Sequence, residues 1–191
     1  MLSHSITRYC FKKGWISEDE QDIYEYGFDI TIYTVWSTAV LLLIGFLLHQ
    51  TVPAIILVFG FYTFQTIGGG YHANTHFRCF STMVFGLLTG LSFSFLKEQY
   101  TILWCILGAS GLILIIIPLV LHPNKAYLEP EMKHLSIRSF IITILLLTAT
   151  VILNSFYNRM FYVFSAVFFL AALSRIAGKI AYQNHKIQSE H

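Results

Sequence analysis

Apolar residues occur in long runs along this chain, instead of at the spacing of an amphipathic helix or a half-buried strand. A helix that spans a membrane needs about 20 mostly apolar residues, and about 17 is the lower limit. The runs predict about six spans, at 28–48, 51–67, 81–97, 101–121, 139–157 and 160–177. Several of the polar breaks between them are very short, so sequential spans are expected to be antiparallel. The pattern therefore predicts an all-α, polytopic membrane helical bundle.

The predicted third span is less regular than the others. It contains Gly86, Gly90 and several hydroxyl side chains. Such a segment could be tilted, or could be a re-entrant piece that packs against other helices instead of lipid. An alternative with four spans and two re-entrant half-helices therefore stays open.

Residues 1–26 form a unit of mixed polarity before the first span. Ile6, Tyr9 and Trp15 belong to a short apolar side. The sequence Ser-Glu-Asp-Glu from Ser17 to Glu20 resembles a capping box, which would begin a helix that continues into the first span. We expect an N-terminal amphipathic helix that either lies on the inner leaflet of the membrane or packs on the bundle as a cytoplasmic helix.

The composition supports lipid as the surrounding solvent. Hydrophobic residues make up 55% of the chain and charged residues only 12%, whereas a soluble domain carries roughly 25% charged residues. The net charge is +2, and no basic stripe with interleaved aromatic residues is present. Nucleic acid is therefore excluded as an expected partner, and membrane lipid is expected.

The positions of the basic residues predict the orientation. If the N-terminus is cytoplasmic, every Lys and Arg except Lys97 and Arg159 falls on the cytoplasmic side. Positive residues concentrate on that side of membrane proteins. We therefore expect a bundle over 27–177, with loops 68–80 and 122–138, both termini and the tail 178–191 in the cytoplasm.

The chemically richest segment is Gly68–Phe80, which lies between two apolar runs and contains three glycines, two histidines, an arginine and a cysteine. Polar groups at membrane depth are costly, so such a cluster indicates a functional site. Consecutive glycines allow unusual backbone conformations and the close approach of another chain. Cys79 is the candidate nucleophile, because Cys10 and Cys105 lack a comparable polar setting.

A cysteine nucleophile needs an imidazole close to its thiol. His72 precedes Cys79 by seven residues, which is about 10 Å along a continuous helix. A hydrogen bond reaches only about 3 Å, so the helix would have to break between them. His76 could reach Cys79 on an intact helical turn. Spacing alone therefore favours His76.

Three other interpretations of these residues remain. His72, His76 and Cys79 could bind zinc with a fourth ligand from elsewhere in the chain. Alternatively, the histidines mark the membrane interface and Cys79 packs as a small apolar residue. A transporter or channel would be expected to carry paired broken helices and intramembrane acids. The single polar break and the absence of acids from the later spans disfavour transport.

The same residues resemble a known family. The run Gly69-Gly70-Tyr71-His72-Ala73, followed by Thr75 and Arg78-Cys79, is similar to the accessory gene regulator protein B (AgrB) family of Gram-positive bacteria. Glu25-Tyr26-Gly27 and His122-Pro123-Asn124-Lys125 support the resemblance. It implies a multi-pass cysteine endopeptidase of the bacterial plasma membrane, without a metal or cofactor. It assigns the catalytic roles to His72 and Cys79, against the preference from spacing.

The resemblance also implies a reaction on an AgrD-like propeptide in quorum sensing. Cys79, activated by His72, would release the C-terminal tail and hold the peptide as an acyl-thioester. A cysteine or serine of the propeptide would then form a thiolactone or lactone ring. Arg78 could orient an acidic tail or serve only as a topology anchor, and a homodimer is one of the expected assemblies. The candidate substrate contacts are Gly69, Gly70, Arg78, Asn74, Gln65 and Lys125, of which Asn74 and Gln65 could instead orient the imidazole.

Overall fold

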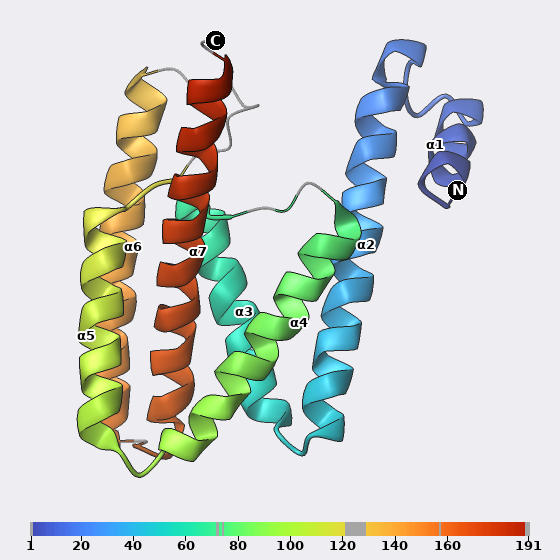
Figure 1. Cartoon of the computed structure of the whole chain (residues 1–191). Coiled ribbons are helices and arrows are strands. Elements are labelled where there is room, and N and C mark those ends of the chain that lie inside the picture. The colour runs from blue at the N-terminus through green and yellow to red at the C-terminus, as the bar shows by residue number, and fades with distance from the viewer. Residues whose placement is uncertain (1, 72, 74, 121–128, 157, 190–191) are drawn as a thin grey trace.

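The computed structural model describes residues 2–71, 73, 75–120, 129–156 and 158–189. These residues form seven α-helices (Figure 1). Three short 3-10 segments accompany them, at Glu18–Glu20, Phe93–Leu96 and Asn158–Met160. The helices are α1 (Leu2–Lys12), α2 (Gln21–Leu47), α3 (Thr51–Gly68), α4 (His76–Ser92), α5 (Tyr100–Ile116), α6 (Glu129–Phe156) and α7 (Phe161–Ser189).

The predicted all-α membrane bundle is confirmed. In the described part of the chain, five helices are long and apolar enough to cross a membrane, and α5 is a shorter apolar helix. Helix α4 and its 3-10 extension run without a break from His76 to Leu96. The third predicted span is therefore a full, tilted helix (Figure 1), and the alternative with two re-entrant half-helices is wrong.

Helix α4 begins at His76 and α7 ends at Ser189, outside the bounds predicted for their spans. Two further helix boundaries differ from the prediction. Helix α5 ends at Ile116 instead of continuing to residue 121, because the residue before Pro118 is disfavoured in the helical conformation. Helix α6 already begins at Glu129, inside the loop predicted for 122–138. Pro130 lies in its first turn, where a proline costs no hydrogen bond. Hydropathy alone did not locate either boundary.

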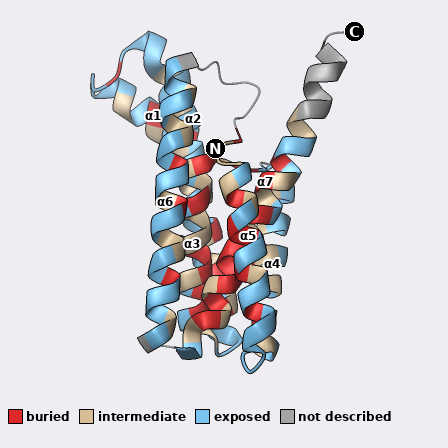
Figure 2. Cartoon of the chain, turned by 90° about the vertical axis from the view of Figure 1, so that its left-hand side faces the viewer, coloured by how far each residue is buried: buried red, intermediate tan, exposed pale blue. Residues whose placement is uncertain are grey.

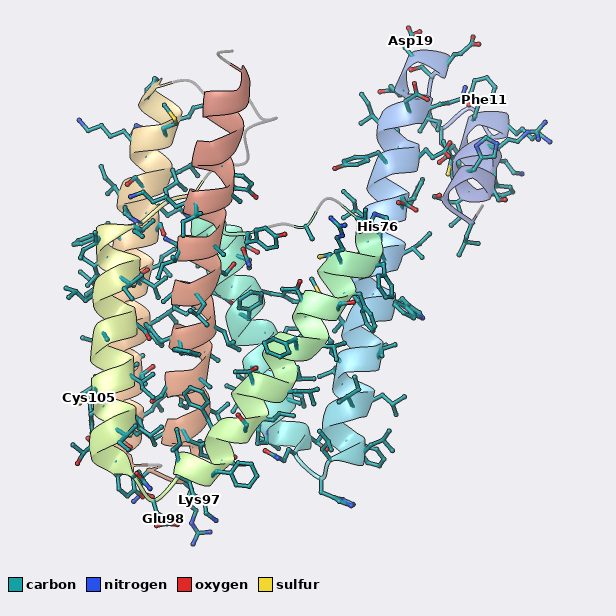
Figure 3. All side chains as sticks on the ribbon, in the orientation of Figure 1. Phe11, Asp19, His76, Lys97, Glu98 and Cys105 are labelled. Carbon is teal, nitrogen blue, oxygen red and sulfur yellow. The ribbon has the colours of Figure 1, made fainter. Side chains whose placement is uncertain are left out.

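The helices α2 to α7 run alternately up and down (Figure 1), so both termini and the glycine segment lie at the same end of the bundle. Lys97 and Glu98 lie at the opposite end (Figure 3). Helix α7 is the most buried span: half of its most apolar window is buried, against 17% for α2. Buried residues gather where the helices face one another, and exposed residues cover the outside (Figure 2).

The N-terminal unit packs against one helix of the bundle. Helix α1 lies beside the upper part of α2 (Figure 1), with Thr7 buried and the His4 Nδ1 atom 2.9 Å from a carboxylate oxygen of Glu25. The predicted capping box is present, because the backbone N–H and the hydroxyl of Ser17 both donate to the Glu20 carboxylate. The sequence signal at residues 17–20 therefore marks the true beginning of this helical stretch.

Candidate active site

The three glycines end α3 and turn the chain across the bundle. Gly69 has φ +67° and ψ −164°, a conformation open essentially only to glycine. Its neighbour Gly68 accepts a hydrogen bond of 2.9 Å from the backbone N–H of Val120. A Cβ atom on Gly69 would overlap the carbonyl oxygen of Val120. The glycines therefore allow the close approach of another segment of the same chain, at Val120.

A buried arginine fixes the beginning of this segment. Arg175 of α7 is only 1% exposed and packs directly on Gly68, where a Cβ atom would overlap the guanidinium group. It donates to the carbonyl oxygen of Ile117 at 2.7 Å, to that of Pro118, and to the Ser139 hydroxyl at 3.1 Å. All three acceptors are neutral. Arg175 thus joins the ends of α3 and α5 to α6 and α7.

The rest of the glycine segment also lies on α7. The backbone N–H of Tyr71 donates to the carbonyl oxygen of Ser174 at 3.0 Å and contacts its hydroxyl at 3.1 Å. Gln65 donates to the same hydroxyl at 2.7 Å. A Cβ atom on Gly178 would approach the Gly70 carbonyl carbon to 2.8 Å. Gln65, a predicted site residue, therefore belongs to the anchored side of the segment.

Cys79 lies in the first turn of α4, which begins after a non-helical stretch. Thr75 caps the helix by accepting a hydrogen bond from the Arg78 N–H at 3.3 Å. Cys79 is half-buried and Arg78 is exposed. Helix α3 ends at Gly68 and α4 begins at His76. The helix break that a dyad of His72 and Cys79 requires is therefore present.

The first turn of α4 packs against α2. The ring of His76 stacks on the ring of Tyr33 with a centroid distance of 4.6 Å, and its Nε2 atom lies 3.7 Å from a carboxylate oxygen of Asp29. The Tyr33 hydroxyl donates to the carbonyl oxygen of His76 at 2.9 Å and lies near the side chain of Cys79. One turn deeper, the rings of Trp36 and Phe80 pack 5.0 Å apart.

Spacing alone favoured His76 as the partner of Cys79. In the structure its described side-chain partners are instead Tyr33 and Asp29 of α2, and none of its described contacts joins the imidazole to the thiol. Tyr33 is a residue that the sequence analysis missed. It precedes Cys79 by more than one full span, and no local motif connects the two positions.

A cavity of about 280 Å³ lies beside Cys79, between α2, α3, α4 and α7. Its wall is overwhelmingly apolar, and Cys79 forms part of it together with Tyr71 and Ala73 of the non-helical segment. The polar groups of the wall include Gln65 and Ser174. The thiol therefore borders an apolar space between these four helices.

Several predicted site residues lie outside the described part of the chain, namely His72, Asn74 and Lys125. The structure therefore does not place the predicted catalytic histidine. Among the described residues, no group of three or more His, Cys, Asp or Glu side chains could hold a metal ion. The zinc hypothesis includes His72, so the geometry of that full ligand set is not described.

Together, the apolar antiparallel helices and the half-buried thiol define a polytopic helical membrane protein with a candidate thiol site at one end of its bundle. A family model described as Accessory gene regulator B matches residues 3–176. The chain belongs to the accessory gene regulator B family. Membership connects it to the agr quorum-sensing system and to protease-like, multi-pass membrane proteins. Neither the curated proteins nor the solved structures contain a match to this chain.

Proposed function

We propose that this protein is a membrane cysteine endopeptidase that removes the C-terminal tail of an autoinducing-peptide precursor and enables its cyclisation. The observation that carries the proposal is the place of Cys79, which is half-buried in the first turn of α4 and forms part of the wall of an apolar cavity. In the sequence, His72 lies between the end of α3 at Gly68 and the beginning of α4 at His76. Family membership supplies the system in which such a substrate occurs.

In the proposed reaction, His72 takes the thiol proton and the Cys79 sulfur attacks the carbonyl carbon of the scissile bond. The carbon–nitrogen bond breaks, the proton passes to the leaving amine, and the tail departs. The retained peptide is then bonded to Cys79 as a thioester. A cysteine or serine side chain of the precursor attacks that thioester, forms the ring and releases the thiol.

Cyclisation requires that water does not reach the thioester first. An apolar cavity excludes water from reactive intermediates, and the space next to Cys79 has this character. Arg78 is exposed at the same helix end and could pair with an acidic tail as it leaves. We place this end of the bundle in the cytoplasm, because the basic residues of the chain concentrate there.

Co-expression of the full chain with a short AgrD-like propeptide tests the proposal, with the released tail measured by mass spectrometry. Cys79→Ala should abolish release, and His72→Ala should lower it by a factor of about 100 or more. Cys105→Ala is the matched control, because Cys105 is an exposed thiol on α5 and should be dispensable. Release at full rate by Cys79→Ala would reject the peptidase, and loss of release on chelation would favour a metal site.

A further inference from the structure

The cavity beside Cys79 extends in one direction along α4. Its wall on this helix begins at Cys79 and continues through Thr82 and Gly86 to Thr89. The helical rise between Cys79 and Thr89 is about 15 Å. This direction leads away from the end of the bundle that carries the glycine segment (Figure 1). A group held in the cavity would therefore lie on the inner side of the sulfur.

The wall of the cavity selects for apolar groups. None of the described residues that line it is charged, and bulky side chains such as Leu41, Phe61 and Phe85 contribute to it. An apolar cavity of about 150 Å³ in another protein stays dry and binds benzene. A volume of about 280 Å³ therefore accommodates a large aliphatic or aromatic side chain.

We propose that this cavity is the specificity pocket for a bulky apolar side chain on the acyl side of the cleaved bond. This inference rests on the proposed function. The acyl residue is the one whose carbonyl carbon becomes bonded to Cys79, so its side chain stays in the bundle until the ring closes. The tail must leave, and the exposed end of α4 at Thr75 and Arg78 lies on the opposite side of the thiol.

Gly86 offers a position at which the free volume of this pocket can be reduced. It lies in the pocket wall, and a Cβ atom added to it would meet no atom within 4 Å. A side chain at this position can therefore fill the pocket without moving the backbone. Gly108 of α5 is equally open but lies away from the cavity. The two positions are matched, because replacing a helical glycine changes helix propensity similarly at both.

The test uses the full-length protein in lipid nanodiscs and two alkylating probes, the chloromethyl ketones of acetyl-phenylalanine and acetyl-alanine. The thiolate displaces chloride and forms a carbon–sulfur bond, which mass spectrometry localises to Cys79. The phenylalanine probe should label Cys79 at least about tenfold faster than the alanine probe, in line with discrimination by apolar pockets. Gly86→Leu should remove this preference, Gly86→Ala should reduce it, and Gly108→Leu should preserve it.

Equal labelling rates for the two probes would overturn the pocket, as would a preference that survives Gly86→Leu in correctly folded protein. If a lipid chain fills the cavity in nanodiscs, the two probes should also label Cys79 at equal rates. That outcome would likewise reject the cavity as a specificity pocket. Failure of the proposed function gives a different result, since Cys79→Ala would then still process the propeptide. Rapid labelling of Cys79 without a side-chain preference would reject the pocket alone.

Discussion

The two sides of the candidate site are held in different ways. The glycine side is tied to α7 and to the end of α5 by backbone hydrogen bonds at Gly68 and Tyr71 and by the buried Arg175. The cysteine side leans on α2 through stacked rings and the hydroxyl of Tyr33. The glycine side is held mainly by backbone hydrogen bonds and a buried arginine, whereas the cysteine side depends on exposed or half-buried side-chain contacts. Changes to the glycine side should therefore reduce the stability of the fold. Changes to the contact with α2 should mainly reduce the rate of peptide processing.

The largest effect is expected for Gly69→Ala. Alanine would have to adopt a backbone conformation reserved for glycine, and its Cβ atom would overlap the carbonyl oxygen of Val120. We expect a loss of about 2–4 kcal/mol in the free energy of unfolding and loss of peptide processing. Thermal unfolding in detergent measures the first effect, with Gly108→Ala as the control. An unchanged unfolding midpoint would show that the glycine side does not have a fixed backbone conformation.

Arg175→Lys should have the next largest effect. Lysine carries one ammonium group and cannot reproduce the fork with which the guanidinium reaches Ile117, Pro118 and Ser139. The expected loss in the free energy of unfolding is on the order of 2 kcal/mol. Arg159→Lys, at an exposed position near the opposite end of the bundle, should change it by less than about 0.5 kcal/mol. Equal midpoints for the two variants would contradict the role of Arg175.

Tyr33→Phe tests the other side of the comparison. The variant keeps the ring that stacks on His76 but loses the hydroxyl that donates to the His76 carbonyl oxygen. Stability should fall by only about 1 kcal/mol. Peptide release should slow several-fold, because the first turn of α4, which contains Cys79, loses a positioning contact. Tyr24→Phe, on the same helix and 43% exposed, is the control and should leave both quantities unchanged. A stability loss without a change in rate would make Tyr33 a packing residue only.

The smallest effect is expected for His76→Ala. Its imidazole is 62% exposed, and an exposed ion pair with Asp29 contributes about 0–1 kcal/mol. Processing should fall at most a few-fold, whereas His72→Ala should nearly abolish it. Parallel rate measurements on the two variants decide between two assignments of the catalytic base: His72, which the family resemblance indicates, and His76, which the spacing favours. The reverse order of the two effects would identify His76 as the catalytic base.

Much of the fold could be predicted from the sequence, because lipid requires long apolar runs that hydropathy detects directly. The span expected at 51–67 is the helix Thr51–Gly68, and the capping box at Ser17 is present. The end of α5 could not be predicted in this way, because hydropathy does not register the backbone restriction that Pro118 imposes. The early beginning of α6 was missed for a related reason, since a proline in a first turn is compatible with a helix.

The candidate site was predictable only where it is local in sequence. The helix break before Cys79 follows from the glycines and from Thr75, which are neighbours along the chain. The contacts with Tyr33 and Ser174 depend on which helices pack together, and no local pattern encodes that choice. Arg175 was interpreted as a charge that orients the chain. The sequence contains the charge but does not show the three acceptors that make its burial tolerable.

The Arg175 junction also bears on how the protein is made. Helix α7 is the last of the described helices to leave the ribosome, and a charged residue in a span is costly without acceptors. Those acceptors, at the end of α5 and on α6, precede α7 in the sequence and are translated first. They can therefore be in the membrane before the guanidinium of Arg175 is inserted. The Ser174 oxygens that accept hydrogen bonds from the glycine segment belong to the same late helix. A nascent chain therefore lacks these contacts of the glycine segment until α7 is in place.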